Sequence, residues 1–355
     1  MKQDTLRLCL VADPALLRRP GGWQVQVDQT IAALARLREC DGAALALELK
    51  EPHAVTPTGY DVLHVFGADG ASGRLVADAA ALQVPVLLSP RVAAGWTRSN
   101  GSRARVADRV QGNRTDWDLD TGYARIRRAL QGATLIAAQA GSEGKAICDA
   151  FLIAPGKLRE IPNAAGAPFF DAEPGRFRER SRIAGRFALM VGDVSPYNDQ
   201  LGVARLLAAL ALPLVVVGDA RERDAAYLRE LRKLRTVTCL GALDHHDPLL
   251  PSAYAAASVL ILCSQGAALP MSAIEALAAG TPVVSAGRPP AELAGSGFAL
   301  KQLAAGASEA LQREVALLMA VPPERARVRA LVADYTWDRV AGQLLGCYQE
   351  LAGLR

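Results

Sequence analysis

The sequence predicts an α/β protein with two Rossmann-like domains that face each other across a central crevice, each built on a parallel sheet. Short apolar runs typical of buried parallel strands alternate with amphipathic helical segments in two separate blocks. Between the blocks lies a stretch rich in Pro, Arg and Phe with little periodicity, which is typical of a linker. The chain has 355 residues, 51% of them hydrophobic, which is enough for two cores.

The first block is expected to form an N-terminal domain over residues 1–165. Its first strand, at 6–12, precedes a loop with Gly21-Gly22 and a helix from about Val25 to Arg38. Further strands are expected at 43–49, 61–66, 84–88, 134–138 and 158–161, and helices at 72–82, 126–130 and 142–151. Residues 93–123 carry several arginines and few aliphatic runs, so we expect an irregular segment or a mobile helix–loop. Such a segment is either a solvated surface loop or one that meets an anionic or lipid-phosphate acceptor, with peripheral membrane contact.

The second block is expected to form a C-terminal domain over residues 184–335, after a linker at 166–183. Its strands are expected at 187–192, 214–217, 237–239, 259–262 and 282–285, and its helices at 201–210, 224–233, 249–256 and around 311–318. Ser272 and Glu275 have the spacing of a capping box, so another helix is expected to begin near Ser272. A last helix is expected at 340–351 within the segment 336–355.

Composition argues against several classes of function. The net charge of +4 is small for this length, so no nucleic-acid partner is expected. No apolar run approaches the roughly 18 residues that span a bilayer, and the N-terminus is typical of a strand rather than a secretory signal. The six cysteines are scattered without a CxxC pair, which predicts free thiols and a cytoplasmic location. His245-His246-Asp247 is interpreted as a solvated turn, and we predict no metal site.

Small residues follow the strands of the second block. Gly192, Gly218, Gly241 and Ser264 stand at the ends of predicted strands or just after them, and the carboxyl ends of parallel strands meet at one edge of a sheet. The helix predicted at Ser272 would direct its first backbone N–H groups and a partial positive charge to the same edge. Neither block has a GxGxxG after its first strand, which argues against a nicotinamide cofactor. The pattern predicts a nucleotide with its pyrophosphate at a helix N-terminus.

Further segments occur in a set order along the chain. They are Gly21-Gly22, the strand at 61–66, Ile161-Pro162-Asn163, Gly192–Gly202 (GDVSPYNDQLG), Leu240-Gly241-Ala242-Leu243 with the helix at 249–256, Ser264 through Gly280-Thr281-Pro282-Val283-Val284, Pro290-Ala291-Glu292, and Tyr335-Thr336-Trp337. Together they resemble the GT-B glycosyltransferases of the retaining type, called glycosyltransferase family 4 or group 1, over nearly the whole chain. The resemblance implies a nucleoside-diphosphate sugar as donor substrate, with no metal and no other cofactor. It also implies a glycan, lipid-linked or small-molecule acceptor, and a last helix that returns to the N-terminal domain.

The resemblance also implies a set of site residues. The donor would contact Gly21, Gly22, Gly192, Ser195, Asn198, Gly218, Gly241, Ser264, Ala267, Ala268, Leu269, Met271 and Glu275. Glu275 matches the family's ribose-binding glutamate, while the residues alone also allow it to be the capping-box partner of Ser272. His64, near a strand end, is a candidate for a catalytic, sugar or acceptor contact, or else has a structural role.

The chain departs from the family's motifs at charged positions. Ala267 stands where the family has the first of two glutamates, and Asp193 and Asn198 stand where it has an Arg and a Lys that neutralise the pyrophosphate. One such contact is worth roughly 2.7–4 kcal/mol in a transition state, so another cation is needed. Arg288 or a basic residue of the segment 93–114 is a candidate. Two alternatives stay open: a non-catalytic GT-B homologue acting as a binding or partner subunit in glycan assembly, and an epimerase-like enzyme that uses nucleotide sugars.

Overall fold

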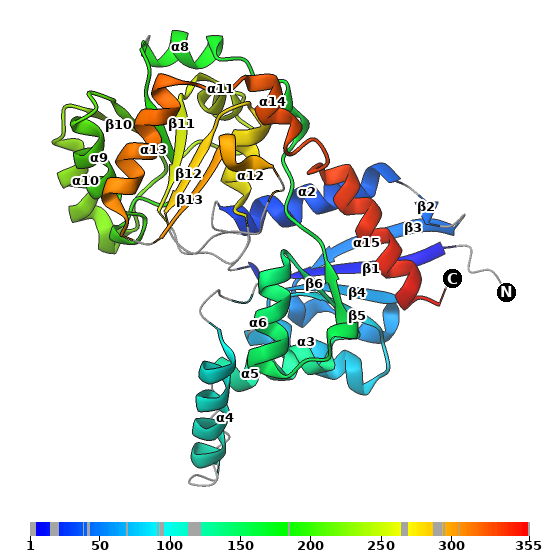
Figure 1. Cartoon of the computed structure of the whole chain (residues 1–355). Helices are drawn as coiled ribbons and strands as arrows, with labels where there is room; N and C mark the ends of the chain where they lie inside the picture. The colour runs from blue at the N-terminus through cyan, green and yellow to red at the C-terminus, as the bar shows by residue number, and fades with distance from the viewer. Residues whose placement is uncertain are drawn as a thin grey trace. The chain divides into compact units, whose positions relative to one another are not determined.

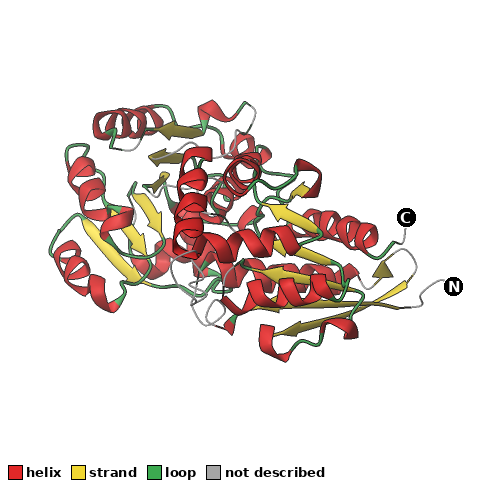
Figure 2. Ribbon diagram, turned by 90° about the horizontal axis from the view of Figure 1, so that it is seen from below, coloured by secondary structure: helices red, strands yellow, loops and turns green. Residues whose placement is uncertain are grey.

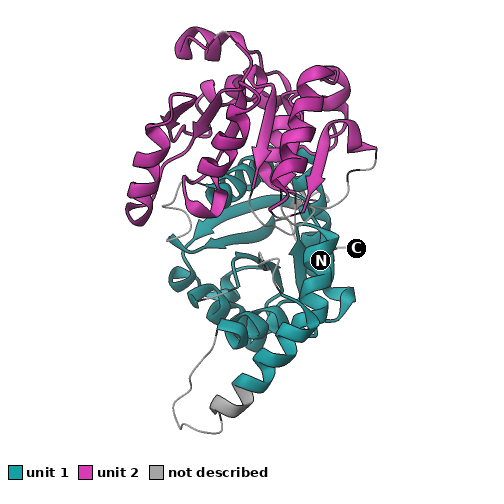
Figure 3. Ribbon diagram, turned by 60° about the vertical axis from the view of Figure 1, so that its left-hand side comes forward, with its two compact units in different colours: residues 1–162, 337–355 teal, residues 163–336 magenta. Residues whose placement is uncertain are grey.

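The computed structural model describes residues 5–14, 21–37, 39–40, 43–68, 70–90, 92, 96–112, 122–183, 185–263, 269–286, 293, 295–304 and 306–353. The chain forms two compact units (Figure 3). Unit 1 comprises Met1–Pro162 with Trp337–Arg355, and unit 2 comprises Asn163–Thr336. Each unit is a parallel sheet with helices on its faces (Figures 1 and 2), which confirms the predicted fold class.

Unit 1 is built on seven strands. They are β1 (Thr5–Ala12), β2 (Glu39–Cys40), β3 (Ala43–Lys50), β4 (Val62–Phe66), β5 (Val86–Ser89), β6 (Leu135–Ala138) and β7 (Leu158–Glu160), in the order β2-β3-β1-β4-β5-β6-β7. The pairing is parallel throughout except between the short β2 and β3. The helices are α2 (Gly22–Leu37), α3 (Gly70–Ala81), α4 (Arg98–Gly112), α5 (Gly122–Gly132), α6 (Gly141–Phe151) and α15 (Trp337–Leu351). β4 and β5 are buried along their whole length, because helices cover both faces of the sheet (Figure 1).

Of the two alternatives for the segment 93–123, an irregular segment or a helix–loop, the structure has a helix, α4, at residues 98–112. Gly101 lets α4 approach α6 so closely that a Cβ at this position would lie 2.2 Å from the carbonyl oxygen of Ala150. Arg105 donates to the same carbonyl oxygen at 2.7 Å and to the hydroxyl of Tyr123 at 3.2 Å. α4 is therefore packed through a glycine and an arginine, which a search for an apolar stripe does not detect.

A buried histidine connects α15 to the sheet of unit 1. His64 on β4 is 1% exposed; its Nδ1 lies 2.8 Å from the hydroxyl of Tyr348 on α15, and its Nε2 lies 2.9 Å from Oγ of Ser89 on β5. Burial lowers the pKa of His64 to about 3. His64 is thus a neutral side chain that joins three elements of the unit.

We expect this histidine to make unit 1 less stable in acid. The folded His64 has a pKa of about 3 against an ordinary value of 6.5, so between these pH values only the unfolded chain binds the proton. The free energy of unfolding should then fall by about 1.4 kcal/mol for each pH unit lost below about 6.5. All four tryptophans lie within unit 1, so urea unfolding followed by tryptophan fluorescence reports on this unit alone. In the variant His64→Asn the free energy of unfolding should depend less on pH over this range. The same dependence on pH in the variant and the wild type would contradict the prediction.

Unit 2 is built on six parallel strands. They are β8 (Ala188–Val191), β9 (Leu214–Val217), β10 (Val237–Gly241), β11 (Val259–Leu262), β12 (Val283–Ala286) and β13 (Leu300–Leu303), in the order β10-β9-β8-β11-β12-β13. The helices are α7 (Ala167–Phe170), α8 (Gly175–Ser181), α9 (Gln200–Ala208), α10 (Ala225–Arg232), α11 (Leu249–Ala256), α12 (Met271–Ala278), α13 (Ser308–Ala320) and α14 (Arg325–Ala330). One core cluster lies beneath α7, α8, α11, α12 and α14, and another beneath α9, α10 and α13.

Residues 166–183, for which the sequence predicts a linker, contain α7 and α8. Phe169 and Phe177 from these helices are buried in a core cluster of unit 2. The chain passes between the units at Pro162–Asn163 and again at Thr336–Trp337. The short helices were missed because each buries only one large apolar side chain, which is too few for a helical period.

Five cysteines whose side chains are described are free thiols, as expected: Cys9, Cys148, Cys239, Cys263 and Cys347. Burial raises the pKa of Cys9 to about 11 and that of Cys263 to about 12, so both stay protonated at neutral pH. Within the described ranges, no helix is both long enough and apolar enough to cross a membrane.

Candidate functional site

Three glycines converge at the carboxyl edge of the sheet of unit 2. Gly192 and Gly218 directly follow β8 and β9, and Gly241 ends β10. The backbone N–H of Gly192 donates to the carbonyl oxygen of Val217 at 2.9 Å, and that of Gly218 donates to the carbonyl oxygen of Gly241 at 2.8 Å. All three have a positive φ, of 138°, 147° and 79° respectively. The structure therefore brings these predicted residues together, in backbone conformations that favour glycine.

Two of these glycines differ in what surrounds them. A Cβ on Gly218 would lie 2.0 Å from the carbonyl oxygen of Gly192, so Gly218 is required by the packing of two backbone segments. A Cβ on Gly192 would meet no atom of the described residues within 4 Å. The backbone at Gly192 is thus open to close approach by a ligand, because it has no side chain of its own and no neighbour in the described part of the chain covers it.

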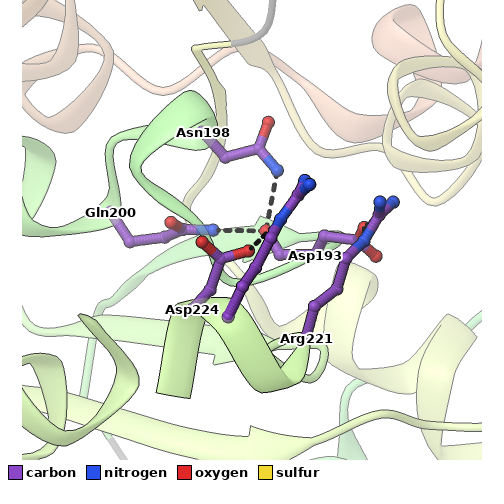
Figure 4. A network of polar contacts seen from close by, with 6 residues as sticks. Asp193, Asn198, Gln200, Arg221 and Asp224 are labelled. Atoms are coloured by element: carbon purple, nitrogen blue, oxygen red, sulfur yellow. Dashed lines mark hydrogen bonds and ion pairs between the residues drawn. The ribbon is translucent and has the colours of Figure 1, made fainter. Parts of the chain in front are cut away.

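The loop after Gly192 is held by its own side chains (Figure 4). The carbonyl oxygen of Asp193 accepts from Nδ2 of Asn198 at 2.7 Å and from Nε2 of Gln200 at 2.9 Å. Oε1 of the same Gln200 amide accepts from the backbone N–H of Ser195 at 3.3 Å. Ser195 and Asn198, both predicted to contact a donor, therefore take part in fixing the loop on which Gly192 lies.

An arginine from the neighbouring loop faces this segment. Arg221, three residues after Gly218, donates to Oδ2 of Asp193 from Nη2 at 2.9 Å and from Nε at 3.2 Å (Figure 4). A guanidinium has five N–H donors, so these two bonds leave three. Both side chains are about half exposed, at 52% and 51%. The sequence instead suggests Arg288 or a basic residue of the segment 93–114 as the cation, although Arg221 is the first basic residue after β9 and was recognisable by that position.

Glu275 lies in a buried polar cluster, and the capping-box interpretation is wrong. α12 begins at Met271 with Pro270 at the N-cap position and no side-chain cap. Glu275 is 4% exposed; its Oε2 accepts from the hydroxyl of Tyr254 at 2.8 Å, and its Oε1 lies 2.8 Å from Nε2 of His245. Both carboxylate oxygens therefore have partners within unit 2.

The partners of Glu275 are themselves held in place. Tyr254 on α11 is fully buried, and burial together with the charge of Glu275 raises its pKa well above the ordinary value, so its hydroxyl remains a donor. The side chain of His245 is 17% exposed and its ring packs against Phe169 at 5.4 Å between centroids. His245 thus differs from the solvated turn that the sequence predicts, whereas its neighbour His246 is exposed. Among the residues in the described ranges, no three His, Cys, Asp or Glu side chains are placed to hold a metal ion.

The remaining predicted residues fall into two groups. Leu269 and Met271 are buried at the start of α12, at 7% and 9% exposure. Ser264, Ala267, Ala268 and Arg288 lie outside the described residues. The loop that would complete the site next to α12 is therefore described only from Leu269 onward.

The predicted residues of unit 1 lie at two places. Gly21 and Gly22 are exposed at the N-terminal end of α2. The cavity next to His64 measures about 10 Å³, which is at most the space of one water molecule and far too small for a sugar. With both ring nitrogens bonded, His64 has a structural role in this unit.

Comparisons with known proteins agree with this architecture. Residues 189–320 match the family model described as glycosyl transferases group 1. They include Glu275 and the glycine edge, which is the carboxyl edge of the sheet with Gly192, Gly218 and Gly241. HepE from Anabaena, solved in complex with UDP, is 16% identical, with a TM-score of 0.73 over 97% of this chain and 100% of that chain. Sucrose-phosphate synthase from Thermosynechococcus elongatus is 17% identical, with a TM-score of 0.72 over 99% and 100%. A glycosyltransferase from Rickettsia africae is 12% identical, with a TM-score of 0.73 over 99% of each chain.

No curated protein sequence matches the chain. The likenesses to solved structures show the GT-B fold, and residues 189–320 of unit 2 are similar to the group 1 glycosyl transferase domain.

Proposed function

We propose that this chain is a glycosyltransferase that moves a sugar from a nucleoside-diphosphate sugar to an acceptor. The observation that carries the proposal is the open backbone at Gly192, on a glycine-lined sheet edge inside the segment that matches group 1 glycosyl transferases. The UDP bound to HepE supports a nucleotide as ligand of this fold. By the same resemblance the reaction is retaining and needs no metal, the acceptor binds to unit 1, and Gly21 and Gly22 approach the donor.

The donor phosphates are proposed to lie at the carboxyl edge of the sheet of unit 2. Negative charge builds on the diphosphate as it leaves, so the site needs donors fixed in advance. Arg221 supplies a cation there, because Asp193 holds its guanidinium while three N–H donors remain. Arg221 would thus take the place of the Arg and Lys that the family has at Asp193 and Asn198.

Glu275 is proposed to accept hydrogen bonds from the ribose of the donor. A carboxylate offers about four acceptor sites, and His245 and Tyr254 occupy two of them. The two partners fix the carboxylate so that the remaining lone pairs have a constant direction. The side chain of His245 is 17% exposed against 6% for that of Glu275, so the histidine is the more accessible member of the pair.

The experiment that tests the function is a nucleotide panel followed by a turnover assay. Thermal unfolding of the whole chain is measured with the diphosphates of uridine, guanosine, adenosine and deoxythymidine, and one of them should raise the melting temperature. Release of that diphosphate from its sugar conjugate should then require an acceptor. Stabilisation without release across a broad acceptor set would favour the non-catalytic binding subunit, and no stabilisation by any nucleotide would overturn both proposals.

A further inference from the structure

A groove lies at the amino-terminal edge of the sheet of unit 2. It has a volume of about 140 Å³, and Arg178, Arg186 and Arg325 contribute to its lining. Ser258 and Pro282, which also line it, immediately precede β11 and β12. The glycine edge lies at the opposite, carboxyl ends of the strands. An occupant of this groove is therefore distinct from the donor phosphates discussed above.

Backbone carbonyls hold the three guanidinium groups in place. Arg186 donates to the carbonyl oxygen of Met319 at 2.8 Å, in the last turn of α13. The other two donate to the last turn of α11: Arg325 to the carbonyl oxygen of Ala255, and Arg178 to that of Ala256 at 3.3 Å. Arginines at helix C-termini are favourable, because they satisfy carbonyls and meet the negative end of the helix dipole. The groups are thus oriented before any ligand binds.

The groove has an excess of positive charge. Two helix C-termini contribute only about half a negative charge each, against three full positive charges. Within the described part of the chain, neither Arg186 nor Arg325 has a carboxylate at ion-pair distance. Partial burial, and then the nearby charges of Arg329 and Arg178, lower the pKa of Arg325, while the charge of Glu173 acts in the opposite direction. Positive neighbours of Arg325 thus outnumber the negative one. An anion in the groove would relieve this repulsion.

We propose that this groove binds the phosphate group of a phosphorylated ligand. Arginine donors match the oxygens of phosphate in pairs, and a fixed guanidinium loses less conformational entropy on binding than a free one. The volume of about 140 Å³ exceeds the roughly 30 Å³ that a water molecule occupies in the liquid, so a phosphate has room together with some of its hydration. The phosphate belongs either to a soluble metabolite or to the head group of an anionic lipid, since both offer the same oxygens.

Calorimetric titration of the whole protein with inorganic phosphate, at low ionic strength, tests the site. The double variant Arg186→Ala/Arg325→Ala should bind phosphate at least tenfold more weakly than the wild-type chain. The matched control is Arg229→Ala, which removes an exposed arginine of α10 that does not line the groove. Should the double variant fail to fold, Arg186→Ala alone serves, because Arg186 is exposed and its loss leaves α11 capped. Equal phosphate affinity in the groove variant and the wild type would overturn the proposal.

Vesicles distinguish the two sources of phosphate. The protein is sedimented with vesicles of phosphatidylcholine containing either phosphatidic acid or phosphatidylserine. Binding to phosphatidic acid that the groove variant loses and the Arg229→Ala variant keeps would support a lipid head group. Phosphate binding without vesicle binding would support a soluble ligand. If the Arg229→Ala variant loses as much affinity as the groove variant, only overall charge matters and the proposal is wrong.

Discussion

Replacing Glu275 by alanine should destabilise unit 2 by at least about 1–3 kcal/mol, the usual cost of one unsatisfied buried group, because the hydroxyl of Tyr254 loses its acceptor and His245, which is partly exposed, loses a partner as well. Tyr254 is the more severe of the two losses, since its hydroxyl is fully buried and out of reach of solvent. Urea unfolding followed by circular dichroism should show the transition of unit 2 at lower urea. Tryptophan fluorescence, which reports on unit 1, is the internal control.

A double-mutant cycle separates this cluster from a general effect of the substitution. Tyr254→Phe removes the donor, so the double variant Glu275→Ala/Tyr254→Phe should lose less stability than the sum of the single changes. Glu275→Gln keeps the shape of the side chain and one acceptor oxygen, and its loss should be intermediate. A Glu275→Ala variant that unfolds within about 0.5 kcal/mol of the wild type would show that the cluster is not formed in solution.

Replacing Arg221 by alanine should lower the rate of glycosyl transfer by about 10²–10³-fold, the usual effect of removing one donor from a developing negative charge. In the wild-type chain the guanidinium is fixed beside Gly192 by Asp193, so the variant loses both the charge and its orientation. The affinity for the nucleoside diphosphate that stabilises the chain should fall as well, which gives a second readout by calorimetry.

Three variants make the role of Arg221 specific. Arg221→Lys keeps the charge without the planar fork, so its activity should lie between those of the wild type and Arg221→Ala. Asp193→Ala frees the guanidinium without removing it, and a smaller loss is expected. Arg229→Ala on α10 controls for net charge and should behave as wild type. Full activity in Arg221→Ala would assign the cation to another residue.

The sheets could be predicted because their strands are buried on both faces. Leu214–Val217 and Val259–Leu262 are continuous apolar runs, and the structure has β9 and β11 at these same bounds. Helices that pack through a polar or small residue have no comparable apolar pattern in the sequence. α4, which packs through Gly101 and Arg105, is an example. The strand β13 and the helix α14 were not predicted either, since each is short and only partly apolar.

The candidate site could be predicted only where it follows strand ends. Gly192, Gly218 and Gly241 are recognisable because a glycine at the end of a buried strand marks a turn whose backbone takes a positive φ. The spacing of Ser272 and Glu275 satisfied a local rule, but Tyr254, 21 residues away in sequence, and His245, 30 residues away, compete for the same carboxylate. Such contacts depend on how α11, α12 and the loop after β10 pack, which no local spacing encodes.

α15 is the last helix to be synthesised, although it belongs to unit 1. When residue 162 has left the ribosome, every strand of unit 1 is present, yet Tyr348, the partner of His64, is still almost two hundred codons away. The same holds for Arg36 and Arg159, which pair with Asp338 and Glu350 on α15. Unit 2 is continuous, so all of it is available before the last helix emerges. Unit 1 can therefore be completed only after unit 2 has been synthesised. A chain truncated before Trp337 would contain all of unit 2 but would lack α15 of unit 1.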